Sequence, residues 1–296
     1  MRVVLLSVAG LAAGLVGLGY AGALHPVGDS FAVVRFLALG VLAVALLGLL
    51  RNRLAQVLFV ICVGLFGIRV WHAVPGPSVA APDMVIYQKN MLYHDYDEVA
   101  LAQDIWASGS RVVTLQEVSA AHRDFLHLME DTHPYQLICD GTAVGAVAVL
   151  STDPSVARTC SDPVGIAVMD VAINDGQDLM RVVSVHLHWP WPFEQSSTLD
   201  LILADLEAAD LDAFGAPDHV VVGGDFNMVP WGHSLRRVEA FFGTSRLGHI
   251  EQTFDIFGWP MTIDHVMASA PVEASINVRP LLGSDHHGVV GRVVFD

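Results

Sequence analysis

Three apolar runs fill most of the first 75 residues of this 296-residue chain. The runs cover residues 3–24, 31–50 and 54–74, and Arg35 and Arg69 are the only charged side chains within them. A helix of about 20 apolar residues crosses the roughly 30 Å hydrocarbon core of a bilayer and satisfies its backbone polar groups internally. We therefore expect three transmembrane helices in direct contact with the lipid bilayer.

A cleaved signal peptide is the alternative interpretation of the first run. Arg2 precedes the run, and the Ala21-Gly22-Ala23 segment resembles a small-residue cleavage site. The run is, however, longer than the 7 to 15 apolar residues usual in a signal peptide. Two further runs follow at once, so a retained helix explains more of the sequence.

The short loops predict how the helices are oriented. Arg2, Arg51 and Arg53 flank the runs on one side, whereas the loop 25–30 on the other side contains Asp29 and no Lys or Arg. The positive-inside rule then places the amino terminus in the cytoplasm and everything after residue 75 outside. The two arginines within the runs count against this orientation unless their side chains reach water. With the near-absence of lysine, this predicts a multi-pass protein of a bacterial inner membrane with an extracytoplasmic domain.

Charge divides the chain at the same point. The first 75 residues carry five basic side chains and one acid, a net of +4, and the other 221 residues carry ten basic and thirty acidic side chains, a net of −20. Residues 76–83 form a linker, because the stretch is too rich in Pro and Gly to continue a helix. Residues 84–296 are long enough to form one globular domain with a substantial core.

Short runs of β-branched residues dominate the second part of the chain and predict strands. The expected strands are 84–87, 111–115, 144–150, 165–173, 179–187, 219–223, 262–268, 274–278 and 289–295. Helices are expected over 95–108 and 119–130, and a third from a capping box at Ser197 and Asp200 through Leu211. Strands that outnumber helices indicate packed sheets flanked by helices.

Polar side chains follow several of these apolar strands directly. Asp225 and Asn227 come after the strand 219–223 and two glycines, and residues two apart in an extended segment share a face. A Gly-Asp turn that closes a hairpin is the alternative. Other strands also end in polar or ionisable side chains, and in a packed sandwich these strand ends would lie together at one edge. These further side chains are Asn90, Gln116, Glu117, His186, Asp264, Asp285 and His286.

Together these residues resemble the endonuclease/exonuclease/phosphatase superfamily, which has the deoxyribonuclease-I-like fold. The resemblance covers residues 84–296 and leaves the three apolar runs outside it. It implies an α/β fold, a four-layered sandwich of two packed mixed sheets flanked by helices, that hydrolyses phosphoesters with a divalent metal. The matching elements, in family order, are Asn90, Gln116-Glu117, His186-Leu187, Gly224-Asp225-Phe226-Asn227, Ile263-Asp264 and Ser284-Asp285-His286.

The resemblance also implies a metal site. Glu117 would be the principal ligand of Mg²⁺ (or Mn²⁺), assisted by Asn90 and Asp285. Hard oxygen donors of this kind suit both ions, which also hold substrate phosphate.

The remaining motif residues would carry the chemistry. His286, oriented by Asp264, would be the general base for an attacking water. Asp225 and Asn227 would position that water and the phosphate oxygens, and His186 would donate to the phosphate or assist the leaving group.

Other polar residues near these motifs have weaker support. His188 shares a strand face with His186 but matches no family position, and His287 is expected at the surface. His265 follows the motif aspartate without a required role. Lys89, the single lysine, is next to Asn90 either by coincidence or as a phosphate contact.

The cysteines add one open question. Cys62 lies in the third apolar run, where packing explains it. Cys139 and Cys160 belong to the domain expected outside, where an oxidising compartment permits a disulfide. The sequence alone leaves open whether they pair.

The substrate is less constrained than the reaction. A net charge of −20 disfavours tight duplex binding, which needs Lys and Arg contacts to phosphates. The segment 188–193, His-Trp-Pro-Trp-Pro-Phe, fits a platform for stacking bases, a lip that dips into the bilayer, or a packed loop.

We expect a membrane-anchored, divalent-metal-dependent phosphodiesterase, first of all an endonuclease-type nuclease that takes a nucleic-acid phosphoester. A phospholipid or sphingolipid phosphodiesterase or phosphatase, acting on a lipid head group, is the second hypothesis. A binding module that keeps the fold without catalysis is the third, and the intact motif set argues against it.

Overall fold

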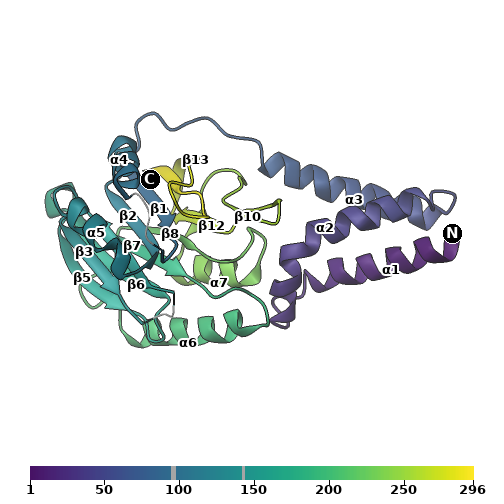
Figure 1. The fold of residues 1–296 in the computed structure, drawn as a ribbon, viewed down its shortest axis with the longest axis horizontal. Helices are drawn as coiled ribbons and strands as arrows, with labels where there is room; N and C mark the ends of the chain where they lie inside the picture. The colour runs from purple at the N-terminus through teal and green to yellow at the C-terminus, as the bar shows by residue number, and fades with distance from the viewer. Residues whose placement is uncertain (95–97, 142–143) are drawn as a thin grey trace.

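A computed structural model describes residues 1–94, 98–141 and 144–296, and its amino-terminal part is a bundle of three helices beside a larger domain (Figure 1). The helices are α1 (Arg2–Leu18), α2 (Val27–Leu47) and α3 (Arg53–His72). Among the described residues, α2 and α3 are long and apolar enough to cross a membrane by length and composition.

The first helix differs from its predicted span. It has 17 residues and ends at Leu18, where the apolar run continues to residue 24. At 1.5 Å per residue it measures about 26 Å, short of the roughly 30 Å hydrocarbon core. The sequence pattern misses this end because Gly, Ala and Leu are as apolar in the turns of residues 19–24 as in a helix. Of the three predicted transmembrane helices, the second and third are therefore long enough to span a membrane, and the first is not clearly so.

Within the described residues, the domain contains two mixed sheets of six strands each. The first sheet has the order β13 (Pro271–Val278), β14 (Val289–Phe295), β1 (Met84–Asn90), β2 (Val112–Val118), β4 (Ala146–Ser151) and β3 (Tyr135–Cys139). The second has the order β5 (Ser155–Cys160), β6 (Ile166–Ile173), β7 (Asp178–His186), β8 (His219–Asp225), β12 (Asp264–Ala268) and β9 (Ser245–Arg246). A separate hairpin pairs β10 (Phe254–Ile256) with β11 (Trp259–Met261).

The sheets pack face to face because successive side chains of each strand point to opposite sides. Ile86 of β1 and Val182 of β7 belong to the core between the sheets. Their neighbours Tyr87 and Val183 belong instead to the two outer cores, beneath helices. Helices α4 (Glu98–Ser108) and α5 (Arg123–Glu130) cover the first sheet, and α6 (Glu194–Ala208) and α7 (His233–Phe242) cover the second. The predicted four-layered α/β sandwich is confirmed.

Several elements differ from the sequence-based expectation. The sequence pattern does not predict strands β3, β5 and β9, the β10–β11 hairpin or helix α7, because their sequences are short or carry charges. The predicted capping box is wrong: α6 begins at Glu194, and the Ser197 hydroxyl donates to the Glu194 carbonyl inside the helix, at 3.0 Å. The predicted helix over 95–108 is observed from Glu98, and residues 95–97 lie outside the described part of the chain.

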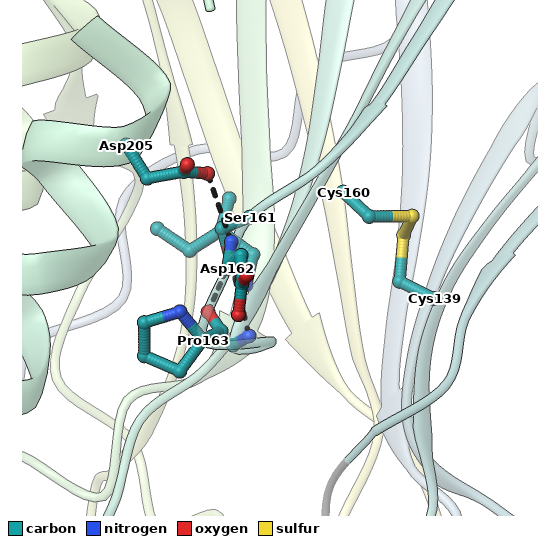
Figure 2. Close-up of a disulfide and its surroundings, with 8 residues drawn as sticks. Cys139, Cys160, Ser161, Asp162, Pro163 and Asp205 are labelled. Carbon is teal, nitrogen blue, oxygen red and sulfur yellow. Dashed lines mark hydrogen bonds between the residues drawn. A yellow bond between two sulfur atoms is a disulfide. The ribbon is translucent and has the colours of Figure 1, made fainter. Parts of the chain in front are cut away.

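The open question about the cysteines is answered by a disulfide between Cys139 and Cys160 (Figure 2). The bond joins the ends of β3 and β5, which are edge strands of different sheets. It therefore ties the two sheets together at one side of the sandwich. Beside it, the Asp205 carboxylate of α6 accepts a hydrogen bond of 2.8 Å from the Asp162 backbone N–H, as Figure 2 shows. Cys62 is buried in the helical bundle.

The bundle is fastened to the domain at the start of α7, which we call the junction. Helix α7 begins after Gly232, a residue with no side chain to cap it. The carboxylate of Asp29 in α2 supplies the cap: it accepts from the backbone N–H of His233 at 2.5 Å and of Ser234 at 2.8 Å, and from the Ser234 hydroxyl at 2.5 Å. The α2 helix is thus part of the fold of the domain.

Aromatic side chains and two arginines complete the junction. The Trp231 indole donates to the Ala32 carbonyl at 2.7 Å. The Arg35 guanidinium lies 4.0 Å from the centre of the Tyr20 ring, and that of Arg69 lies 4.8 Å from the Trp231 ring. Cation–π contacts of this kind accommodate charge within an apolar region. They account for the two arginines that count against the predicted orientation.

Candidate active site

Three neighbouring strands of the second sheet end in ionisable side chains at the same level. His186 ends β7 and pairs in register with Asp225 at the end of β8, which in turn pairs with Asp264 at the start of β12. The alternative of a hairpin turn at Gly-Asp is therefore wrong, since β8 continues through Asp225 in a parallel and an antiparallel pairing. This register is what brings two carboxylates and an imidazole to one edge.

The two glycines before Asp225 are required by close packing. A Cβ atom at Gly223 would lie 2.3 Å from the Thr114 hydroxyl of the opposite sheet, and one at Gly224 would lie 2.2 Å from the Val185 carbonyl. Both distances are far inside van der Waals contact. Gly223 thus lets the second sheet approach the first, and Gly224 lets β8 lie close to its neighbour β7 in the same sheet.

The first sheet contributes Asn90 and Glu117 to the edge where His186, Asp225 and Asp264 lie. The Asn90 amide donates to the Glu117 carboxylate and to the Asp225 carboxylate, both at 3.0 Å, and so bridges the two sheets. Glu117 lies in a bulge of β2 with φ of 57°, and a Cβ on the facing Gly145 would lie 2.7 Å from the Glu117 backbone. The bulge turns the Glu117 side chain toward the edge.

His286 completes the group, which we call the polar cluster: Asn90, Glu117, His186, Asp225, Asp264 and His286. Its Nδ1 lies 2.9 Å from the Asp264 carboxylate, and its Nε2 lies 3.7 Å from that of Asp225. The ring packs against Phe254 of β10 with centroids 4.5 Å apart. The Ser284 hydroxyl accepts from the His286 backbone N–H and donates to the Asn90 carbonyl, which fixes the loop.

Burial and charge perturb the pKa values of the cluster strongly. Burial raises the pKa of Asp225 to about 7, and nearby Asp264 adds to this while His286 opposes it. Burial alone would lower the pKa of His286, but Asp264 and Asp225 outweigh it and raise that pKa to about 10. Burial lowers the pKa of His186 to about 4, with the His286 charge acting in the same direction. At neutral pH the cluster therefore contains a protonated imidazole at His286, a partly protonated carboxyl at Asp225 and a neutral imidazole at His186.

A buried chain of hydrogen bonds supports this edge from between the sheets. The Gln88 amide donates to Gln116 at 2.9 Å and to the Asp264 carboxylate at 3.0 Å. Gln116 donates in turn to the Ser184 hydroxyl at 3.0 Å. Sequence reasoning finds Gln116 through its motif and misses Gln88 and Ser184, although a polar residue inside an apolar strand is a usable signal.

Lys89 has a structural role beside the polar cluster. Its side chain is fully buried, and its ammonium group donates to the carbonyl of Leu281, at 2.6 Å, and to that of His286. Burial lowers its pKa to about 8, although Asp264, Asp285 and Asp104 raise it. Lys89 thus holds the loop that carries His286, and it does so from the strand that carries Asn90.

The other predicted residues lie as follows. Asn227 has φ of 47°, and its side chain donates to the Leu187 carbonyl at 2.9 Å beside Asp225. Asp285 is exposed and lies outside the buried group, so its role as a metal ligand stays a prediction. His265 is buried with its Nε2 2.8 Å from the Met228 carbonyl, and His188 is exposed.

The donors present fit a hard divalent cation. Asp225, Asp264 and His286 offer ligand atoms within 4.8 Å of one another, and Glu117 adds a further carboxylate beside Asn90. Burial is the main cause of the raised pKa of Asp225 and nearby Asp264 adds to it, so a bound cation would neutralise negative charge that is costly to bury here. Oxygen donors of Asp, Glu and Asn are those that Mg²⁺ and Mn²⁺ prefer.

The aromatic segment after His186 packs in part against the bundle. Its Pro190 carbonyl accepts from the Ser30 hydroxyl at 2.6 Å, and the Trp191 ring meets Phe31 edge-on with centroids 5.4 Å apart. Trp189 packs on the core beneath α6 and α7. The packed-loop interpretation therefore holds for Trp189 and Trp191, although Trp191 and Phe193 keep 39% and 41% of their surface exposed.

Part of the chain matches a known protein family. Residues 79–286 match the model of the Endonuclease/Exonuclease/phosphatase family, which spans most of the chain. The match leaves out the helical bundle and covers every member of the polar cluster. No curated protein matches this chain.

Solved structures of low sequence identity share the fold. Truncated TDP2 from Caenorhabditis elegans is 13% identical with a TM-score of 0.55 and covers 71% of this chain and 97% of its own. The 3′ phosphatase NExo from Neisseria, bound to a product DNA hairpin, is 14% identical, with a TM-score of 0.53 and coverages of 72% and 99%. A beta toxin mutant from Staphylococcus aureus with bound magnesium ions is 13% identical, with a TM-score of 0.56 and coverages of 71% and 99%.

Proposed function

Because this chain belongs to the Endonuclease/Exonuclease/phosphatase family, we propose that it is a divalent-metal-dependent phosphodiesterase held at a membrane by its amino-terminal helices. The observation that carries the proposal is the buried His286–Asp264 pair, 2.9 Å apart, with the imidazole Nε2 3.7 Å from Asp225. A base oriented by one carboxylate and facing a second is suited to activating a water molecule.

In the proposed reaction, a water oxygen attacks phosphorus in line with the leaving oxygen. The reaction needs the His286 ring in its neutral form, in which Nε2 takes the proton of that water while Asp264 holds Nδ1–H and stabilises the imidazolium that forms. Asp225 and Asn227 orient the water, and neutral His186 donates a hydrogen bond to the phosphate or the leaving oxygen. The bond from phosphorus to the leaving oxygen then breaks, and the leaving oxygen takes up a proton from solvent.

The proposed metal ion is Mg²⁺ or Mn²⁺, held by Glu117 with Asn90 and, as a further candidate, Asp285. When bound, it supplies positive charge that neutralises the phosphate and the charge that develops during attack. Magnesium is present in the beta toxin mutant of the same fold.

Two substrate classes stay as candidates. Nucleic acid is the first, since the Neisseria phosphatase of this fold was solved with a DNA product. A lipid head group is the second, because α2 packs directly against the segment that follows His186. The −20 net charge of residues 76–296 favours the second over duplex DNA.

The proposed location is outside the cytoplasm, in a bacterial inner membrane. The Cys139–Cys160 disulfide supports this side, since such bonds persist in oxidising compartments. A reporter active in the cytoplasm and fused after Asp296 is expected to be silent, and a strong signal from it would reverse the orientation.

The catalytic assignment is tested on the full-length protein in detergent or nanodiscs with Mg²⁺. The substrates are a soluble aryl phosphodiester, plasmid DNA, RNA and phospholipid vesicles. His286→Ala is expected to lower kcat/KM on the order of 10²–10⁴-fold, the usual contribution of a general base. His127→Ala, a change at an exposed histidine of α5, is the matched control. Equal activity of His286→Ala and the wild type would sink the proposal.

A further inference from the structure

The tip of the β10–β11 hairpin carries two large aromatic side chains into solvent. Phe257 is fully exposed, at 106%, and Trp259 is 46% exposed. The hairpin is paired by Ile256 and Trp259, so Phe257 and Gly258 form its two-residue turn. Exposed aromatic rings at the tip of a hairpin mark a contact surface.

The conformation of the turn makes Phe257 an unusual choice. Phe257 has φ of 51° and Gly258 has φ of 82°, so both central residues are left-handed, as in a type I′ turn. Asn or Asp normally takes the first of these positions, because a bulky side chain is strained there. Within the described structure no burial of the Phe257 ring offsets this strain, which points to a partner outside the protein.

The hairpin lies beside the end of α3. The Ile250 backbone N–H donates to the His72 carbonyl at 2.8 Å. Arg69 and Val70 of α3 line one hollow together with Pro260 of β11. In Figure 1 the hairpin projects from the side of the domain that faces α2 and α3. Trp71, at the same end of α3, is 77% exposed, as an aromatic at the membrane surface would be.

We propose that the hairpin tip, Phe257 with Trp259, inserts into the lipid head-group region next to the outer end of α3. The inference rests on the proposed membrane attachment of α2 and α3. A lipid surface fits better than a nucleic acid, because the two charged side chains of residues 251–260, Glu251 and Asp255, are both acidic. The Asp255 carboxylate accepts from the Gly258 N–H at 2.6 Å and stays exposed.

A consequence follows for the active site. Phe254 belongs to the same hairpin and packs on His286 with ring centroids 4.5 Å apart. A hairpin seated in the head-group region thus places the His286 side of the polar cluster close to the bilayer surface. Phosphoesters carried by lipids would reach the cluster without leaving the membrane.

The insertion is tested by fluorescence quenching in full-length protein. Cys62→Ala removes the free thiol, and Phe257→Cys provides one site for an environment-sensitive label, with Trp259→Cys as a second, independent site. Val60→Cys, on the exposed face of α3, reports whether that helix is in lipid. Phe214→Cys is the matched control, because Phe214 is 73% exposed and lies far from the hairpin along the second sheet. It follows α6 near Asp212, and Asp212 pairs with Arg181 near the end of β7 opposite to His186. The labelled proteins are placed in phosphatidylcholine nanodiscs with or without nitroxide-labelled lipid.

The labels at 257 and 259 are expected to lose most of their emission to the nitroxide lipid, like the label at 60, while the label at 214 keeps its emission. Quenching at 60 without quenching at 257 and 259 would overturn the inference and leave membrane attachment intact. A change at 257 on addition of a DNA oligonucleotide, without lipid quenching, would assign the tip to nucleic acid instead. If the label at 60 is not quenched either, the membrane attachment is wrong and the inference falls with it.

Discussion

The junction and the polar cluster are each built around a buried aspartate, and the two aspartates are satisfied to different extents. Asp29 is 4% exposed and accepts three hydrogen bonds from the first turn of α7. Asp225 is 1% exposed and accepts bonds from Asn90 and Asn227, yet faces Asp264 and Glu117 nearby. A carboxylate whose charge is met by a helix start stabilises the fold. A buried carboxylate whose negative charge is not fully balanced by neighbouring donors lowers the stability of the fold, and it is available for chemistry.

The largest expected effect comes from neutralising the second of these aspartates. Asp225→Asn is expected to lower kcat/KM on the order of 10²–10³-fold, because the side chain no longer orients water with a negative charge. The folded-state pKa of Asp225 is raised to about 7, so the ionised form at neutral pH disfavours folding. The melting temperature of Asp225→Asn is therefore expected not to fall at pH 7.5, as measured by thermal unfolding without metal.

Added Mg²⁺ sharpens this prediction. The wild type is expected to gain melting temperature with Mg²⁺, since a cation that binds only the folded state stabilises it. The gain should be smaller in Asp225→Asn. A fall in melting temperature together with an undiminished gain from Mg²⁺ would show that Asp225 is a structural aspartate like Asp29.

The next effect concerns the pH dependence of the reaction. Asp264 raises the pKa of His286, and the reaction needs that ring in its neutral form. Asp264→Asn removes the charge, so the pKa of His286 falls and the acid limb of kcat/KM moves to lower pH. The rate at the plateau is expected to fall on the order of 10²-fold because the ring loses its orienting partner. A full pH–rate profile of both proteins measures the two changes separately, and an unmoved acid limb would remove His286 as the titrating base.

The junction is expected to respond in the opposite way. Asp29→Asn leaves donors of α7 unsatisfied and is expected to destabilise the protein by about 1–3 kcal/mol. Measured by thermal unfolding in detergent, this lowers the melting temperature while kcat of the folded protein on a soluble substrate stays near that of the wild type. Asp140→Asn, at an exposed position of the same domain, should change stability by less than about 0.5 kcal/mol. Equal melting temperatures for the two variants would mean that the cap does not fasten the bundle.

The same contrast explains how far the sequence predicts the molecule. Sequence motifs predict the polar cluster residue by residue, because each of its members lies in a short motif at or just after a strand end and can be recognised in the local sequence. The motifs also group Asp285 with the cluster because it precedes His286, but Asp285 is exposed whereas His286 is buried. The sequence presents Asp29 only as a loop acid, since nothing in residues 25–30 indicates a partner 204 positions away. Contacts between distant segments, such as this cap and the Lys89 clamp, are fixed by tertiary packing and leave no local pattern.

Lys89 is a third buried charged side chain. A variant at this position tests whether it serves the fold, like Asp29, or the reaction, like Asp225. Its ammonium donates to two carbonyls, one of them that of His286, and no carboxylate bonds to it directly among the described residues. Lys89→Met keeps the volume and removes both bonds, so we expect about a tenfold loss of kcat, equal to roughly 1.4 kcal/mol, as the His286 loop loosens. The pKa of Lys89 is lowered to about 8 by burial, and a group with a lowered folded-state pKa adds stability above its unfolded pKa and loses it as pH falls. The wild type should therefore gain stability between about pH 8 and pH 10, as measured by chemical denaturation, and Lys89→Met should lack that gain. If Lys89→Met keeps both the stability gain at alkaline pH and the wild-type kcat, Lys89 does not position the His286 loop for the reaction. Its place in the sequence next to Asn90 would then be its one link to the site.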